Sequence, residues 1–378
     1  MAKKEIKILF TGGGTGGHLF PIIAIAREIT RLLDRRDATL YYVGPNDKIG
    51  FLLMSQENLK TYGIVSGKLR RYFSFKNVAD IAFNIPLGFL QSFFLLLFIR
   101  PQLVFSKGGS GSLVVTLCAG ILRIPVFLHE SDMSPGLSNR IAYGFAKKVF
   151  TSFAKTEYFD LTKTILVGNP IKKELMEGSY ESAKEIFRLS FKKPVLLFWG
   201  GSQGAEPVND VILNMLRKLL AHYEIIHVCG KKNYQEVEAQ SEVMLAKDKD
   251  LEAYYHLYGF LDEVQLKHAL KVASLIISRG GSGSIFEMAA VGKPCIIIPL
   301  PSAAHNHQSK NAYQYTKSGA AIIIEQENFN PNFFIAKLDY LFSHPEELQA
   351  MKNSALRFAR PLAARTIARE ILEYLRIQ

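Results

Sequence analysis

The stretch Ser106-Lys107-Gly108-Gly109-Ser110-Gly111-Ser112 recurs 172 residues later as Ser278-Arg279-Gly280-Gly281-Ser282-Gly283-Ser284, with one position changed. A second pair of glycine-rich stretches, residues 12–17 and 200–204, follows apolar runs in each half of the chain. Each half therefore contains two units of strand, glycine loop and helix. Such internal repetition indicates two domains of the same architecture.

Short apolar runs alternate with helical segments along the whole chain. They lie at residues 6–10, 40–43, 103–105, 126–128, 195–199, 225–228, 275–277 and 295–298. This alternation is typical of parallel sheets with crossover helices. We therefore predict an α/β fold of two Rossmann-like domains that face each other across a cleft. The first spans residues 1–170 and the second 171–354, and a C-terminal helix at about 355–378 packs back on the first domain.

The positive charge of the chain is concentrated in its first half. Of the net charge of +12 in 378 residues, residues 1–170 carry +10 and the rest carry +2. An anionic partner is therefore expected for the first domain, such as phosphate groups or an acidic membrane surface.

The three cysteines lie far apart, which disfavours a disulfide framework and a structural zinc site. The first ten residues lack the apolar core of a secretory signal.

Glycine loops are suited to bind phosphate, because backbone N–H groups and a helix N-terminus can approach the anion. Residues 12–17 match the dinucleotide pattern, but the next strand ends without the acid that binds a ribose, so NAD is disfavoured. In the second domain, residues 282–287 run from a glycine loop into a helix. Its serines and N–H groups can hold a pyrophosphate, and Glu287 can accept both hydroxyls of a ribose. The alternative is that Glu287 only stabilises the helix dipole.

Three candidates for acid–base chemistry lie in the first domain. His18 directly follows the first glycine loop, and a histidine there can remove a proton from a hydroxyl nucleophile or bind phosphate. Glu130 and Asp132 follow the strand at 126–128 and are alternatives to it. In the second domain, His305 and His307 lack a visible third ligand, so we expect no metal and no cofactor. The amides and hydroxyls around them favour a sugar.

Residues 81–99 form a run of 19 positions without a charge, preceded by a basic and aromatic cluster at 68–76. The run approaches the length of a membrane-spanning helix, but spanning would separate the loop at 106–112 from its own domain. We therefore predict that the first domain lies on an anionic membrane surface. An ordinary buried helix after a basic loop is the alternative.

Taken in chain order, the motifs at 13–18, 129–137, 200–205, 278–287 and 307–312 resemble those of the MurG family. The resemblance covers nearly the whole chain. It implies the GT-B architecture and an inverting transfer of GlcNAc from UDP-GlcNAc to the C4 hydroxyl of MurNAc in undecaprenyl-pyrophosphoryl-MurNAc-pentapeptide. This reaction converts lipid I to lipid II in peptidoglycan synthesis. It further implies a peripheral enzyme on the cytoplasmic face of the bacterial plasma membrane, with other cell-wall synthesis or division proteins as partners and no nucleic acid.

The resemblance also implies roles for individual residues. The donor would be bound in the second domain by Ser202, Leu261, Ser282, Gly283, Ser284, Ile285, Phe286, Glu287 and Gln308. Among these, the serines would contact the phosphates, Glu287 the ribose, Leu261 the uracil through its backbone and Gln308 the GlcNAc.

In the first domain, Thr15, Gly16 and Gly17 would face the donor and the acceptor pyrophosphate, beside His18. This chain has Asp132 where the family often has Asn, and Lys172 where it often has Arg; a lysine cannot make the bidentate fork of an arginine. Two rival functions remain: another GT-B enzyme that uses UDP-GlcNAc, such as an epimerase, and a non-catalytic nucleotide-sugar-binding protein.

Overall fold

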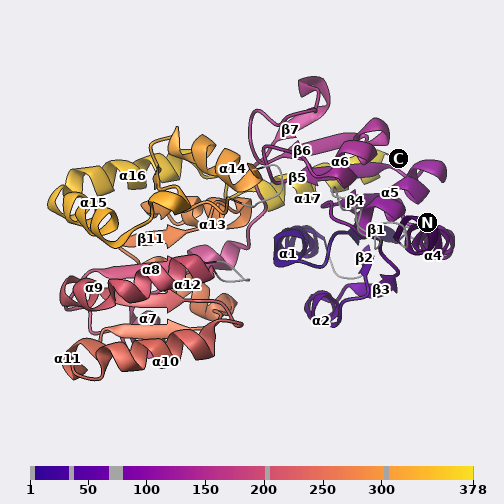
Figure 1. The fold of residues 1–378 in the computed structure, drawn as a ribbon. Helices are drawn as coiled ribbons and strands as arrows, with labels where there is room; N and C mark the ends of the chain where they lie inside the picture. Colours follow the sequence, from indigo (N-terminus) through magenta and orange to yellow (C-terminus); the bar gives the residue numbers. More distant parts are fainter. Residues whose placement is uncertain (1–4, 34–37, 68–79, 201–204, 302–305, 378) are drawn as a thin grey trace. The chain divides into compact units, whose positions relative to one another are not determined.

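The computed structural model describes residues 5–33, 38–67, 80–200, 205–301 and 306–377. Its backbone contacts divide the chain into two compact domains. The first comprises residues 1–172 together with 361–378, and the second comprises residues 173–360. Each domain is a parallel sheet covered by helices (Figure 1), so the prediction of two α/β domains is confirmed.

The first domain is built on a seven-stranded sheet of order β3-β2-β1-β4-β5-β6-β7, in which every pair is parallel. Its strands are β1 (Ile6–Thr11), β2 (Ala38–Pro45), β3 (Lys60–Ile64), β4 (Leu103–Ser106), β5 (Val126–Glu130), β6 (Lys148–Thr151) and β7 (Thr164–Leu166). Its helices are α1 (Gly16–Leu32), α2 (Lys48–Gln56), α4 (Ile85–Ile99), α5 (Ser112–Ile121), α6 (Leu137–Ala142) and α17 (Ala363–Ile377).

The C-terminal helix α17 is part of the first domain, although it follows the whole second domain in sequence. Ile367 and Ile371 are fully buried in the same apolar cluster as β1 and α1. The ring of Tyr374 lies 5.2 Å from that of Phe127, and Glu370 forms a 2.5 Å ion pair with Lys148. Burial of the apolar face of this amphipathic helix stabilises the domain through the hydrophobic effect.

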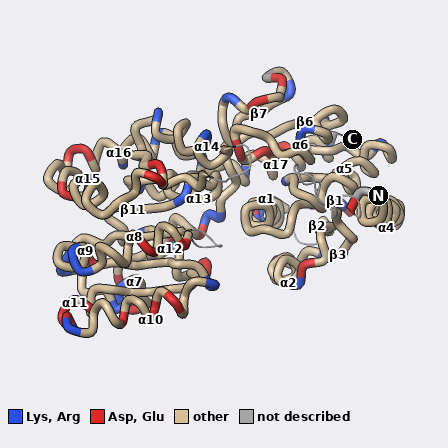
Figure 2. Tube along the Cα trace, in the orientation of Figure 1, with Lys and Arg blue, Asp and Glu red and all other residues tan. Residues whose placement is uncertain are grey.

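Helix α4 has a narrow buried face and a broad apolar exposed one. Gly88, Ser92, Leu96 and Ile99 form the buried stripe, at the spacing of one helix face. Gly88 permits close packing, because a Cβ there would lie 2.1 Å from the carbonyl oxygen of Val65. The remaining surface carries no charged residue, and α4 is tan along its length in Figure 2.

This segment is the one stretch among the described residues that is long and apolar enough to cross a membrane, judged by length and composition. Residues 82–99 have a mean hydropathy of 1.9, and 22% of the segment is buried. A π-helical turn, Asp80–Asn84, precedes α4. The basic and aromatic cluster predicted at 68–76 lies outside the described residues.

The second domain repeats the strand order of the first. Its six-stranded parallel sheet has the order β10-β9-β8-β11-β12-β13, so β8 and β11 correspond to β1 and β4. The strands are β8 (Val195–Trp199), β9 (Glu224–Val228), β10 (Tyr255–Tyr258), β11 (Leu275–Ser278), β12 (Cys295–Ile297) and β13 (Ala321–Ile323). The helices are α7 (Tyr180–Phe187), α8 (Glu206–Asn214), α9 (Leu216–His222), α10 (Tyr234–Leu245), α11 (Lys249–Glu252), α12 (Glu263–Val272), α13 (Ser282–Ala290), α14 (His307–Thr316), α15 (Pro331–Ser343) and α16 (Pro345–Phe358).

The central strands of both sheets lie where the apolar runs predict them. The apolar runs do not include β3, β6, β10 or β13. Three of these strands, β3, β10 and β13, lie at sheet edges, and β3 and β10 have partly exposed side chains. An edge strand is paired on one side only and buries less apolar surface, so its pattern is weaker. In open parallel sheets, ligands bind at the carboxyl ends of the strands, where the glycine loops lie here.

Candidate functional site

In the first domain, the loops after β1 and β4 cross at the carboxyl edge of the sheet. The N–H of Gly13 donates to the carbonyl of Gly108 at 2.8 Å. Gly108 and Gly109 have φ values of +85° and +95°, and a Cβ on Gly109 would lie 2.6 Å from the Cα of Gly13. Because both the positive φ and the close approach require glycine, this part of the repeated stretch is fixed by backbone packing.

His18 lies in the first turn of α1, packed on this crossing. Its Nδ1 is 2.8 Å from the hydroxyl of Thr15, the residue that precedes the helix. A Cβ on Gly13 would lie 3.0 Å from the same Nδ1, so the ring rests on glycine backbone. Burial, and then the positive charge of Lys107, lower the pKa of His18 to about 3. The imidazole is therefore neutral at physiological pH, and this low pKa makes it a weaker base than a free histidine.

Glu130, the last residue of β5, is 5% exposed, and its carboxylate is held by three donors. It accepts hydrogen bonds from the backbone N–H of Asp132 at 3.0 Å, the N–H of Gly136 at 3.2 Å and the side-chain amide of Asn139 at 2.9 Å. Burial and the nearby Asp132 carboxylate raise the pKa of Glu130, against the opposing effect of Lys107. The oxygens of Glu130 are therefore engaged by the loop that follows β5 and by Asn139 of α6.

Lys107, directly after β4, is a buried cation that the sequence analysis did not select. Its side chain is 3% exposed and its ammonium group donates to the hydroxyl of Ser131. Burial lowers the pKa of Lys107, while Glu130 and Asp132 act in the opposite direction. The sequence feature that could have identified Lys107 is its position between a buried strand and a pair of glycines. The sequence does not show that Lys107 is buried, because the burial depends on the loop after β5.

The remaining acceptor-side candidates lie around the same edge. Thr15 precedes α1 in extended conformation, and Gly16 and Gly17 begin the helix. Asp132 lies in the loop after β5. Lys172 places its ammonium group 4.5 Å from the ring centre of Phe20 on α1, a cation–π contact within the first domain.

In the second domain, β11 leads into α13, whose N-terminus follows Gly281. Among the described residues, no side-chain hydrogen bond caps the residue before this helix, and a Cβ on Gly281 would meet none of their atoms within 4 Å. Ser282, Gly283 and Ser284 form the first turn, and Glu287 is partly exposed on the next. The side chains of Ile285 and Phe286 are buried in the core, so these two residues cannot use them to contact a ligand.

The other donor-side candidates are spread over further loops. Leu261 is 5% exposed and directly precedes Asp262, which caps α12. The side-chain oxygen of Gln308, on α14, accepts from the N–H of Leu300 at 3.1 Å. Ser202 and His305 lie outside the described residues. Among the residues that the structure describes, no group of three or more His, Cys, Asp or Glu side chains is placed to hold a metal.

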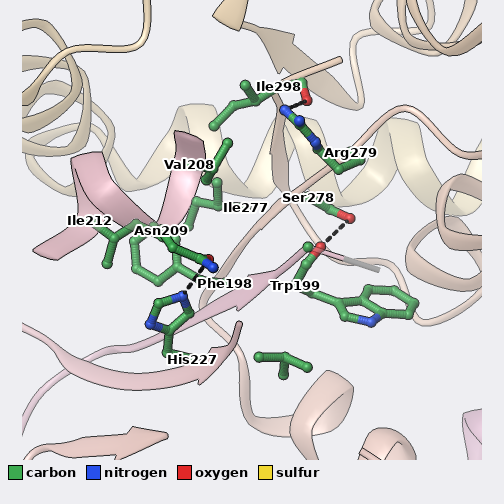
Figure 3. Close-up of a pocket in the computed structure, with 12 residues that line it drawn as sticks. Phe198, Trp199, Val208, Asn209, Ile212, His227, Ile277, Ser278, Arg279 and Ile298 are labelled. Carbon is green, nitrogen blue, oxygen red and sulfur yellow. Dashed lines mark hydrogen bonds between the residues drawn. The ribbon is translucent and has the colours of Figure 1, made fainter. Parts of the chain in front are cut away.

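A small cavity of about 10 Å³ lies beneath this edge of the second domain, between β8, β11 and α8 (Figure 3). Such a volume holds about one water molecule. The buried Arg279 donates from Nη1 to the carbonyl of Ile298 at 3.0 Å and from Nη2 to the side chain of Gln326 at 2.8 Å. Asn209 bridges His227 and the carbonyl of Cys229 at 3.1 and 3.0 Å. These contacts fix the ends of β9, β11 and β12, and the sequence analysis did not single them out.

Comparison with known proteins gives concordant results for both domains. The N-terminal domain model of glycosyltransferase family 28 matches residues 8–151, and its C-terminal domain model matches residues 195–367. The chain is 40% identical over 353 residues to the UDP-N-acetylglucosamine–N-acetylmuramyl-(pentapeptide) pyrophosphoryl-undecaprenol N-acetylglucosamine transferase of Shouchella clausii, covering 92% of this chain and 94% of that protein. It is 35% identical over 354 residues to the Clostridium tetani protein of the same name, covering 93% and 94%.

Two solved structures share the fold. The Acinetobacter baumannii MurG crystal structure matches with a TM-score of 0.74 and 23% identity, over 97% of this chain and 99% of that one. The UDP-GlcNAc 2-epimerase of Neisseria meningitidis, bound to UDP-GlcNAc, matches with a TM-score of 0.71 and 14% identity, over 97% and 100%.

Proposed function

The chain belongs to glycosyltransferase family 28, and we propose that it transfers GlcNAc from UDP-GlcNAc to the C4 hydroxyl of lipid-linked MurNAc, the step that converts lipid I to lipid II. The observation that carries this proposal is the identity of 35–40% over more than nine tenths of the chain to transferases of that printed name. The epimerase alternative has only the shared fold in its favour, at 14% identity.

In this proposal the second domain binds the donor. The open N-terminus of α13 receives the pyrophosphate, since Ser282, Gly283 and Ser284 bring N–H groups and the positive end of a helix dipole to it. Glu287 accepts the hydroxyls of the ribose, Leu261 contacts the uracil through its backbone, and Gln308 contacts the GlcNAc. Ser202 completes the contacts to phosphate.

The first domain then binds the acceptor and performs the proton transfer. The C4 hydroxyl oxygen attacks the anomeric carbon of GlcNAc, the bond from that carbon to the β-phosphate breaks on the opposite face, and UDP leaves with the bonding electrons. His18 takes the hydroxyl proton. When its Nδ1–H donates to Thr15, its Nε2 carries the lone pair that a base needs. Backbone N–H groups and helix N-termini stabilise the leaving pyrophosphate in place of a metal.

Of the two rival bases, Glu130 is the weaker candidate. The carboxylate of Glu130 is occupied by three hydrogen bonds that hold the loop after β5. Asp132 remains the second candidate. We propose that Asp132, with Lys172, Thr15, Gly16 and Gly17, contacts the acceptor.

We also propose that the first domain attaches the enzyme to an anionic membrane surface from the cytoplasmic side. Six apolar side chains of the α4 segment support this; they are between 44% and 78% exposed: Phe83, Leu87, Leu90, Phe94, Leu97 and Phe98. Their spacing places them on one side of the helix, opposite the buried stripe. The positive charge of this half of the chain suits an anionic leaflet, and cell-wall synthesis or division proteins would be partners there.

The deciding experiment is transfer of labelled GlcNAc from UDP-GlcNAc to a lipid I analogue by the purified protein. Formation of the disaccharide product supports the proposal, and release of free 2-epimerised sugar nucleotide with no transfer contradicts it. Binding of UDP-GlcNAc without any turnover would identify a nucleotide-sugar-binding protein instead.

The membrane proposal needs its own test, sedimentation with vesicles that contain anionic lipid. Phe94→Ser together with Phe98→Ser should reduce binding in high salt, because an apolar contact is insensitive to screening. The matched control is Phe191→Ser, an exposed aromatic of the second domain. Equal binding of the double variant and the wild type would exclude α4 as the contact.

A further inference from the structure

The buried ammonium group of Lys107 stands at the centre of the first domain's candidate site. Four titratable groups face it from three elements: His18 on α1, and His129, Glu130 and Asp132 at and after the end of β5. It donates to Ser131, and its backbone N–H donates to the carbonyl of Thr11 at the end of β1 at 2.9 Å. Lys107 therefore connects the loop after β5 to the strand that leads into the glycine loop before His18.

A lysine that is 3% exposed requires compensation, because the interior of a domain solvates a charge poorly. Glu130 and Asp132 supply it, and Glu130 is in turn held by the N–H groups of Asp132 and Gly136. Without the ammonium group, the buried Glu130 carboxylate would lose the nearby cation that favours its charged form. The loop conformation at 131–136 and the charge of Lys107 therefore depend on each other.

We propose that Lys107 is a positioning residue of the transfer reaction, whose ammonium group holds Ser131 and Asp132 in register with His18. This inference rests on the proposed function for its place in the reaction, although the loop geometry is independent of it. Lys107 does not touch substrate in this role. It fixes where the acceptor-binding loop lies relative to the group that takes the proton.

The test compares Lys107→Met, which removes both charge and hydrogen bond, with Lys107→Gln, which keeps a donor. Lys147→Met, an exposed lysine of the same domain, is the control. In Lys107→Met, the amides of Asp132 and Gly136 should exchange hydrogen at least about tenfold faster, because the carboxylate that they bind loses its counter-charge. Turnover should fall about 100-fold with the dissociation constant for UDP-GlcNAc unchanged, as expected for a misplaced acceptor. Lys107→Gln should behave like Lys107→Met because the charge, not the donor, is required.

Three results would overturn the proposal. Unchanged amide hydrogen exchange and unchanged turnover in Lys107→Met would exclude any role for Lys107 in the reaction. Slower turnover with unchanged exchange would mean that Lys107 acts on substrate directly. Wild-type behaviour of Lys107→Gln would show that the charge is not needed.

A further variant covers the case in which Lys107→Met does not fold. The double variant Lys107→Met with Asp132→Asn restores the charge balance and should fold with normal exchange at Gly136. Its failure to fold would assign Lys107 to the scaffold alone. A wild-type protein without transferase activity would refute the proposed function, whereas the exchange rates would still test Lys107.

Discussion

The two near-identical stretches at 106–112 and 278–284 adopt different backbones. In the first domain, Gly108 and Gly109 take positive φ values, and helix α5 begins only at Ser112. In the second, Gly281 has φ −67° and ψ 133°, and helix α13 begins at Ser282, two positions earlier in the repeat. The shared sequence is compatible with both, because glycine permits either sign of φ. The neighbouring chain therefore decides where each helix begins.

The neighbours differ in which glycine of the pair they approach. The first stretch crosses the loop after β1, where Gly109 leaves no room for a Cβ beside Gly13. In the second, Gly280 packs against the backbone of Gln308, with 2.3 Å from a Cβ to its carbonyl oxygen, while Gly281 faces open space. One copy thus forms a packed support for His18. In the other, Gly281 has no close neighbour among the described residues and leads directly into a helix N-terminus, the kind of position that binds anions.

The basic residue at the second position of each stretch is buried in both domains but is compensated differently. Lys107 faces the carboxylates of Glu130 and Asp132. Arg279 donates to a carbonyl and an amide, and burial lowers its pKa to about 10. Arg279 is held by neutral hydrogen-bond acceptors, which keep its planar guanidinium group in place. The environment of Lys107 instead depends on whether the neighbouring carboxyl groups are charged.

If the first domain binds the acceptor and the second binds the donor, variants in the two domains should have opposite kinetic effects: one should lower turnover and the other should lower donor affinity. The largest effect is expected for His18→Ala, because loss of a general base costs about 10²–10⁴ in rate. UDP-GlcNAc affinity should stay nearly unchanged. Turnover and the donor dissociation constant are measured on one preparation. Near-normal turnover would move the base role to Asp132, and an equal loss of donor affinity would place His18 on the donor.

Glu287→Ala should show the reverse pattern. Charge-assisted hydrogen bonds of this type contribute about 1.5–3 kcal/mol each, so donor affinity should fall about 10–150-fold. Turnover at saturating donor should remain close to that of the wild type. Calorimetric titration with UDP gives the affinity, and the circular dichroism spectrum controls for folding. An unchanged dissociation constant in the folded variant would exclude ribose binding by Glu287.

Alanine at the equivalent glycines of the two stretches tests the backbone difference itself. Gly109→Ala combines a strained φ with a contact to Gly13, and we expect a loss of about 2–4 kcal/mol in the free energy of unfolding. Gly281→Ala has ordinary φ and open space, so its loss should stay within about 1 kcal/mol. Urea denaturation compares the two. Similar losses would show that the two loops are equally constrained in solution.

The last prediction concerns pH and one histidine in each domain. Burial lowers the pKa of His18 and of His227 to about 3 each, and Lys107 adds to the effect at His18. The unfolded chain takes up a proton on each histidine near pH 6.5 while the folded chain does not, so stability is lost as the pH falls below 6.5. Between pH 7 and 5 each should cost about 2 kcal/mol of unfolding free energy. Ring resonances of both should stay those of neutral imidazole from pH 8 to 5, and a titration midpoint near 6.5 would contradict this.

The sequence predicts the central strands well because they are fully buried, and their apolar runs are continuous. It selects His18 and Glu130 as similar candidates, since both follow strands at the same edge. The structure shows that their surroundings differ: the His18 ring lies on glycine backbone beside Thr15, whereas the Glu130 carboxylate accepts from the loop that follows it and from Asn139 of α6. Residue type cannot show which polar groups are already bonded within the fold.

The sequence by itself determines the architecture, because the repeated strand–glycine-loop–helix pattern and the spacing of apolar runs are local properties that each half satisfies independently. It also determines the family, through motifs that extend over nearly the whole chain. Tertiary structure alone decides that Lys107 is buried among carboxylates, that α17 returns to the first domain, and that two nearly identical glycine loops begin their helices at different positions. These features arise where segments that are distant in sequence pack together. The free energy of each depends on contacts with those distant segments, which the local sequence pattern does not show.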